Sequence, residues 1–167
     1  DKYGLEFRPF YFGRELVKQG HAVTVIAAGY SHLRRKNPDV CADFTEEWIE
    51  GIRYVWMKTP AYRKNDLRRL LNMAAFLRKL KQYAPRIAAA YRPDAVVASS
   101  TYPYDVRDAR RIADCCQNPC RVLYEIHDLW PLSLIELYHL SEKNPYIRSL
   151  QKAENSAYRL SDGVISI

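Results

Sequence analysis

Apolar and polar positions along the chain follow two periods, one typical of buried strands and one typical of amphipathic helices. Four short runs are rich in β-branched and aliphatic residues, and the first is nearly all apolar, as expected for strands inside a parallel sheet. Between them, apolar residues recur every three or four positions, as expected for helices with one buried face. The runs that predict buried strands are residues 21–28, 94–100, 121–127 and 163–167.

The helical segments carry recognisable start and stop signals. The first begins near Arg8-Pro9 and ends at Gly20, because glycine readily adopts the left-handed backbone that terminates a helix. Proline and short polar residues, which favour a helix start, open the later helices. These starts are Pro103 with Asp105, Pro131, and Asn144 with Pro145.

The order of these elements predicts an α/β fold. We expect a Rossmann-like, doubly wound and mostly parallel sheet. Residues 45–49 and 52–58 alternate around Glu50-Gly51, which predicts a β-hairpin inserted beside that sheet. A helix that precedes a buried parallel strand normally follows another strand. We therefore expect one domain over residues 1–167 that lacks its first strand and is truncated at both ends.

Positive charge is concentrated in residues 61–92. This segment holds nine basic residues and one acidic residue, a local charge of +8 against +7 for the whole chain. A helix cap is available at Asn65 or Asp66, and Pro85 predicts a kink or a break into two helices. We expect an apolar stripe to pack in the core while the outward charges contact an anionic membrane; the alternative is that the charges only face water. The stripe consists of Leu67, Leu70, Leu71, Ala74, Leu77, Leu80 and Ala84, and the expected membrane contacts are Arg68, Arg69, Arg78 and Lys79.

Several classes of function receive no support from the sequence. No run approaches the ~18 apolar residues of a membrane-spanning helix, and neither a G-x-G-x-x-G nor a Walker loop occurs. The histidines lack the i, i+4 spacing of a metal-binding helix, so we expect neither a metal nor a bound cofactor. The cysteines form no C-x-x-C pair and are expected to be small buried side chains in a reducing compartment. They are Cys41, Cys115, Cys116 and Cys120.

Polar residues gather where the predicted strands end. His127 and Asp128 close one strand, and the hydroxyl residues 99–101 close another. Ligands of open α/β sheets bind at this carboxyl edge, where such groups can contact sugar hydroxyls or phosphate. An alternative is that Asp128 only caps the helix beginning near Pro131 and His127 is a loop-edge residue. Likewise, basic residues 34–36 either contact an anionic acceptor or form a solvated loop.

Several sequence motifs resemble the N-terminal domain of family 4 glycosyltransferases, which belong to the retaining GT-B class. The more specific motifs resemble the bacterial subgroup that builds capsule, O-antigen or exopolysaccharide chains. The generic motifs are Tyr3-Gly4 with Arg8-Pro9-Phe10, residues 14–25 and residues 154–166. The subgroup motifs are Ser31-His-Leu-Arg-Arg35, residues 51–60, Ala98-Ser-Ser100 and Glu125-Ile-His-Asp-Leu-Trp-Pro131.

The resemblance implies transfer of a sugar from a nucleotide-sugar donor to a glycan or polyprenyl-linked acceptor. In such enzymes the N-terminal domain mainly holds the acceptor, and a C-terminal domain holds the donor nucleotide. By position, His127 and Asp128 are the expected catalytic residues, with His127 against the transferred sugar and Asp128 orienting the loop or meeting the acceptor. The expected substrate-binding residues are Tyr3, Gly4, Arg8, Ser31, His32, Arg34, Ser99, Ser100, Thr101, Tyr104 and Trp130.

The expected location is cytoplasmic, peripheral to the inner face of the plasma membrane. Two other classes remain open at this stage. One is a non-catalytic sugar-binding or lipid-binding domain. The other is a basic nucleic-acid-binding module, although no helix-turn-helix, RNA-recognition or zinc-finger pattern accompanies the charge, and we expect no nucleic-acid partner.

Overall fold

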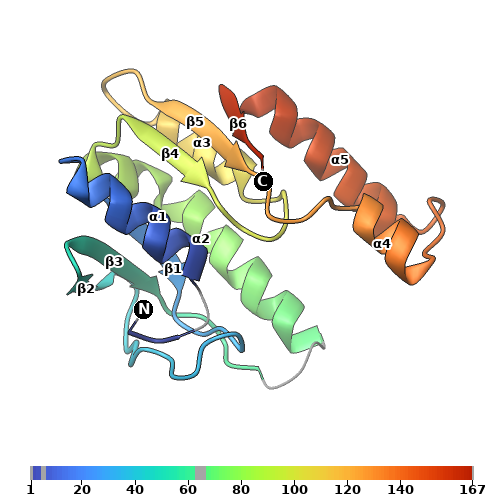
Figure 1. The fold of residues 1–167 in the computed structure, drawn as a ribbon, viewed down its shortest axis with the longest axis horizontal. Helices are drawn as coiled ribbons and strands as arrows, with labels where there is room; N and C mark the ends of the chain where they lie inside the picture. The colour runs from blue at the N-terminus through green and yellow to red at the C-terminus, as the bar shows by residue number, and fades with distance from the viewer. Residues whose placement is uncertain (1, 5–6, 63–66, 167) are drawn as a thin grey trace. The chain divides into compact units, whose positions relative to one another are not determined.

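The computed structural model describes residues 2–4, 7–62 and 67–166. Its internal contacts divide the chain into two compact units, Asp1–Lys79 and Leu80–Ile167. Each unit contains one three-stranded sheet with helices (Figure 1). The predicted α/β class, with parallel strand pairs in both units, is confirmed, and the described strands are distributed between two sheets.

The first unit follows the predicted order of helix, glycine stop, strand and hairpin. Helix α1 is followed by Gly20 in the left-handed region with φ of 90°. The hairpin turns at Glu50 and Gly51, which both have positive φ. Its second strand pairs in parallel with β1, so the hairpin completes the sheet in the order β1-β3-β2 instead of lying beside it. The elements are α1 Phe7–Lys18, β1 Thr24–Ala28, β2 Thr45–Ile49 and β3 Ile52–Met57.

Alternate residues of β3 and the buried face of α1 form the core of this unit. Phe10 is 1% exposed, Ile52 is fully buried, and Trp56 is 2% exposed. The ring of Tyr3 packs edge-on against Trp56, with centroids 5.5 Å apart. Burying an aliphatic or aromatic side chain of this size contributes about 1.5–3 kcal/mol. The segment at Tyr3 is thereby fixed to the sheet.

Helix α2, Leu67–Tyr91, buries a different face from the predicted one. Leu67, Leu70, Leu71 and Ala74 are exposed, whereas Leu80 and Ala84 of the predicted stripe are buried. The buried face instead follows i, i+4 spacing and consists of Asn72, Phe76, Leu80, Ala84 and Ala88, with Ile87.

Asn72 holds the first turns of α2 in place, and Pro85 lies inside the helix. The Asn72 amide explains the orientation of the first turns, because Nδ2 donates to Thr59 Oγ1 at 2.9 Å and to the Pro60 carbonyl at 2.8 Å. The helix runs through Pro85, so it does not break into two helices there, and the alternative of a kink at Pro85 stays a prediction. The predicted cap at Asn65 or Asp66 lies outside the described residues.

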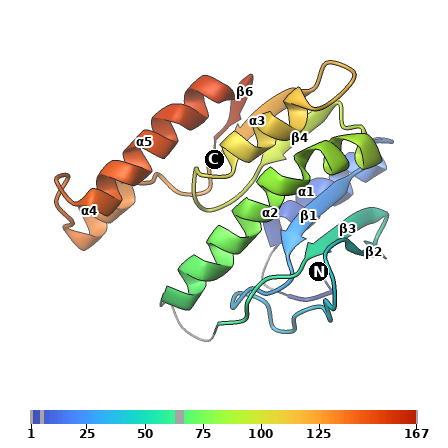
Figure 2. The same cartoon turned by 180° about the vertical axis from the view of Figure 1, so that it is seen from behind.

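The second unit is a parallel sheet in the order β4-β5-β6 with helices α3 and α5 packed on it (Figure 2). Asn144 caps α5, since its side chain accepts a hydrogen bond from the Tyr146 amide. The short α4 lies beside the start of α5 in both views. The elements are β4 Ala95–Ala98, α3 Val106–Asp114, β5 Arg121–Glu125, α4 Leu132–Tyr138, α5 Pro145–Leu160 and β6 Gly163–Ile165.

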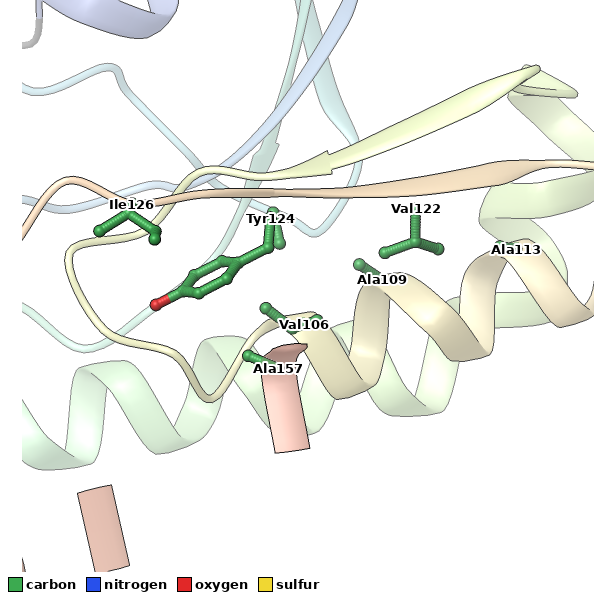
Figure 3. Close-up of a cluster of buried hydrophobic side chains, with 8 residues drawn as sticks. Val106, Ala109, Ala113, Val122, Tyr124, Ile126 and Ala157 are labelled. Carbon is green, nitrogen blue, oxygen red and sulfur yellow. The ribbon is translucent and has the colours of Figure 1, made fainter. Parts of the chain in front are cut away.

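The core of the second unit lies between β5 and helix α3 (Figure 3). Val122 and Tyr124 project from the strand towards Val106 and Ala109 of the helix. Val106 and Val122 are both fully buried. The small residues of α3 allow the helix to approach the sheet closely, so the strand ends are held on a rigid support.

The prediction of buried cysteines is wrong for Cys41 and Cys115, whereas Cys120 packs against the core of the second unit. Cys41 and Cys115 are exposed, and Cys116 and Cys120 are half-buried; all four are free thiols. Cys115 lies at the C-terminal cap of α3, after the last core residue of the helix, Ala113.

Candidate functional site

The carboxyl ends of β4 and β5 bring together three polar side chains. Ser99 directly follows β4, Glu125 is the last residue of β5, and His127 lies two residues further on. Ser99 Oγ donates to Glu125 Oε2 and lies 3.0 Å from His127 Nε2. The same imidazole nitrogen lies 3.2 Å from Glu125 Oε2. Because the two strands are parallel neighbours, the predicted residues Ser99 and His127 meet at one edge.

Glu125 is a member of this cluster that was not predicted as a site residue. It is 2% exposed, and its carboxylate would carry a large desolvation cost without the hydroxyl and imidazole partners. The signal for it was present in the sequence. Residues i and i+2 of an extended segment share a face, so a carboxylate two positions before His127 in an apolar run marks a shared site.

Asp105 closes the loop that follows Ser99. It is 6% exposed, and its carboxylate interacts with the side chain and backbone of Ser100. Burial raises the pKa of Asp105 to about 6, although the hydrogen bonds from Ser100 act in the opposite direction. Its Oδ1 atom is buried without a hydrogen-bond partner among the described residues. Asp105 therefore ties the end of β4 to the start of α3, and sequence reasoning had assigned it only a helix start.

The other predicted residues of this unit lie around the same loops. Tyr104 places its hydroxyl 3.0 Å from Ser149 Oγ, and Thr101 is half-buried. Asp128 is exposed, and its backbone carbonyl accepts a hydrogen bond from the backbone N–H of Trp130, which is half-buried. The cap residue of α4 is Pro131, so Asp128 does not cap that helix. The interpretation of Asp128 as a helix cap is therefore wrong.

The predicted residues of the first unit form a separate group on the loop after β1. Ser31 organises this loop, because its backbone N–H donates to Asn37 Oδ1 at 2.8 Å and its Oγ accepts from Leu33 N–H at 3.3 Å. His32 is exposed, and its Nδ1 lies 2.9 Å from the Tyr62 hydroxyl. The His32 ring also packs against the buried Tyr62 ring, with the ring centres 5.3 Å apart, so the tyrosine holds the imidazole on this loop.

Arg34 differs from its neighbours in this loop because it is 8% exposed. Its Nη1 donates to the Ala28 carbonyl at 2.8 Å, and its guanidinium lies 4.7 Å from the centre of the Trp56 ring. The guanidinium thus anchors the loop to the end of β1 through a hydrogen bond and a cation–π contact. Arg35 and Lys36 are the exposed charges of this stretch.

Tyr3, Gly4 and Arg8 lie at the start of the same unit. Tyr3 is buried and donates to Glu47 Oε1 at 2.6 Å, and Trp56 Nε1 donates to the same oxygen at 2.8 Å. Gly4 has a φ of 75°, which favours glycine, and Arg8 is exposed. The tyrosine therefore has a structural contact, and its partner Glu47 is a half-buried residue that the sequence did not indicate.

Lys79 and the arginines of α2 have different surroundings. Lys79 Nζ lies 2.5 Å from Asp43 Oδ1, and its side chain is only 16% exposed. Arg68 and Arg78 are exposed, and Arg69 is half-buried. No group of three or more His, Cys, Asp or Glu side chains suited to a metal occurs within the described ranges.

The arrangement in the second unit suits contact with a polyhydroxyl ligand. A hydroxyl, a carboxylate and an imidazole meet at the ligand edge of a parallel sheet; Glu125 is buried, whereas Ser99 is half-buried and 16% of the His127 side chain is exposed. Comparison with protein-family models matches residues 4–167 to the family described as Glycosyltransferase Family 4. No curated protein and no solved structure shows a significant match. Since the family match covers nearly the whole chain, the chain belongs to glycosyltransferase family 4, and its class of activity is glycosyl transfer.

Proposed function

We propose that this domain forms the acceptor side of a retaining glycosyltransferase that builds a bacterial surface polysaccharide. The donor is a nucleotide-sugar, held mainly by a second domain, and the acceptor is a glycan or a polyprenyl-linked sugar. The observation that carries the proposal is the cluster of Ser99, Glu125 and His127 at the carboxyl edge of β4 and β5. The subgroup motifs around residues 31 and 127 support the polysaccharide role.

The chemistry of transfer explains why such a cluster is useful. The bond between the anomeric carbon and the nucleotide diphosphate breaks, and that carbon bonds to an acceptor oxygen, whose proton is taken up in the end by the departing diphosphate. Positive charge develops on the sugar ring during this exchange, as in other reactions at the anomeric carbon. Fixed dipoles and a positioned imidazole beside the ring stabilise this state more than the ground state. His127 supplies the imidazole, and Asp128 meets the acceptor; the exposure of Asp128 supports this role.

A transfer assay with the full-length protein tests this function. Radiolabelled UDP-, GDP- and dTDP-linked sugars are supplied one at a time, with isolated glycan or lipid extract as acceptor. We expect label from one donor to enter the product, with the anomeric configuration of the donor preserved in its NMR spectrum. An inverted configuration would contradict the retaining mechanism. Binding of glycan or lipid without transfer from any donor would favour the non-catalytic binding domain instead.

We further propose that the exposed face of α2 contacts the anionic inner surface of the plasma membrane. Leu67 is 76% exposed and Leu71 is 61% exposed, and they share one face of the helix with Arg78 because the spacing is i, i+4 and i+11. Exposed leucines beside basic residues are typical of helices that lie in the interface of a bilayer. Over the described residues, no helix has the length and apolar character needed to cross a membrane.

Liposome co-sedimentation tests the membrane contact. Replacing Arg68, Arg69 and Arg78 by glutamine should weaken binding to anionic vesicles by about tenfold or more, since each basic residue near the surface contributes about 1 kcal/mol. Leu67→Ser with Leu71→Ser should weaken binding in the same way. Lys143→Gln with Lys152→Gln, which remove exposed charges from the other unit, serve as the control. Unchanged binding by the arginine and leucine variants would rule out this face.

A further inference from the structure

Hydrogen bonding among Ser99, Glu125 and His127 limits which imidazole nitrogen can carry the hydrogen. A carboxylate only accepts hydrogen bonds, and a serine hydroxyl has one hydrogen to donate. Ser99 donates its hydrogen to Glu125 Oε2, so it has none left for the imidazole. His127 Nε2 lies 3.0 Å from Ser99 Oγ and 3.2 Å from Glu125 Oε2. Both neighbours of Nε2 are therefore acceptors.

Only one neutral form of the imidazole satisfies this environment. With the hydrogen on Nε2, the ring donates to the serine oxygen and the carboxylate oxygen together. With the hydrogen on Nδ1, the lone pair of Nε2 would face a carboxylate oxygen at 3.2 Å, and the two would repel each other. The repulsion is strong because Glu125 is 2% exposed and little water is available to screen it.

We propose that Glu125 and Ser99 are positioning residues that hold His127 in the Nε2–H form, so that Nδ1 is presented to the substrate as a hydrogen-bond acceptor. The first half of this inference concerns the fold alone, whereas the second half rests on the proposed transferase function. Among the described residues, no hydrogen-bond partner of Nδ1 is found. The lone pair on Nδ1 is thus the group that His127 offers to a ligand.

The fixed tautomer defines which ligand group His127 recognises. A neutral imidazole nitrogen with a lone pair accepts a hydrogen bond from a hydroxyl but cannot donate one to a phosphate oxygen. His127 therefore binds a sugar hydroxyl of the donor or acceptor, and the phosphates must be bound by other groups. This arrangement also allows Nδ1 to receive a proton from that hydroxyl.

Nitrogen NMR of the protein labelled with ¹⁵N-histidine tests the inference without any assay of activity. Spectra are recorded at about pH 8, above the ordinary imidazole pKa of about 6.5, and the His127 signals are assigned by their loss in His127→Gln. We expect only the Nε2–H form in the wild type and in Ser99→Ala, where Glu125 still accepts from Nε2. In Glu125→Gln, whose amide can donate to Nε2, the Nδ1–H form should become detectable. Glu154→Gln, which changes another partly buried carboxylate of the same unit, should leave the His127 spectrum unchanged.

The outcomes separate the positioning role from the proposed function. A wild-type protein with the Nδ1–H form would overturn the inference, as would a Glu125→Gln protein with only the Nε2–H form. Circular dichroism establishes that Glu125→Gln is folded. If the tautomer changes as expected but transfer by Glu125→Gln and by His127→Ala remains at the wild-type rate, the positioning role stands and the catalytic role of His127 fails. A fall in the kcat of Glu125→Gln with little change in KM would connect the positioning role of Glu125 with the catalytic role of His127.

Discussion

Replacing His127 by alanine should lower the turnover of the full-length enzyme by more than tenfold while leaving the fold intact. A positioned acid or base group typically contributes about 10²–10⁴-fold to a rate, so a tenfold loss is the lower limit of the expected effect. The fold should tolerate the change because Ser99 still donates to Glu125 when the imidazole is removed. The buried carboxylate then retains a partner, which avoids the main cost of breaking a buried polar cluster.

Initial rates of sugar transfer and thermal unfolding of the same preparations provide the measurement. His21→Ala is a suitable control, because His21 is exposed and lies in the other unit, just before β1. It should keep wild-type turnover and stability. A His127→Ala enzyme with near-wild-type turnover would remove His127 from the site, whereas a large loss of thermal stability would indicate that the imidazole supports the fold.

The strand-end part of the site could be predicted from the sequence because it depends on backbone order. Parallel strands place their carboxyl ends at the same edge, so an apolar run that ends in Ser99 and another that ends in His127 predict neighbouring side chains. The structure confirms this pair at 3.0 Å. Glu125 could have been included by the same reasoning, since it lies two residues before His127 on the same strand.

The spacing of apolar residues along α2 did not determine which face of the helix is buried. Leucine and alanine occur on more than one face of this helix, and hydrophobicity gave no reason to prefer the face of Phe76 over that of Leu67. The choice depends on long-range hydrogen bonds from Asn72 to Thr59 and Pro60. Such partners, like the pairing of Lys79 with Asp43, lie far away in the sequence and leave no local periodic signal.

Arg34 illustrates the same limit for a charged loop. The run of three basic residues predicted either contact with an anionic acceptor or a solvated loop, yet Arg34 packs its guanidinium on Trp56 and is 8% exposed. Arginine combines a long apolar stem with a planar group that stacks on aromatic rings, so its charge does not require full exposure. A pattern that treats all basic residues as equivalent cannot separate it from Arg35 and Lys36.

The buried carboxyl of Asp105 should make the protein less stable as the pH rises from about 4 to above 6. Burial raises the pKa of Asp105 in the folded protein to about 6, against the ordinary value of 3.8 for an exposed aspartate. Below pH 3.8 the Asp105 carboxyl is protonated in both the folded and the unfolded protein, so its ionisation does not lower the free energy of unfolding. Between the two values the unfolded chain has released the proton while the folded protein still binds it, and stability falls with rising pH. Above the folded value the loss is complete and amounts to at most about 3 kcal/mol.

Asp105→Asn removes the ionisation and keeps an oxygen that can accept from Ser100. We expect it to raise the free energy of unfolding by about 2 kcal/mol at pH 7.5, and to differ little from the wild type near pH 4, where Asp105 is largely protonated in the folded protein. Urea unfolding of both proteins across this range measures the difference. Asp114→Asn, an exposed change on the same helix, should alter stability by less than about 0.5 kcal/mol at every pH. If Asp105→Asn instead destabilises the protein at pH 7.5, the carboxylate is charged and stabilised there by Ser100 and the start of α3, and its burial is not a net cost.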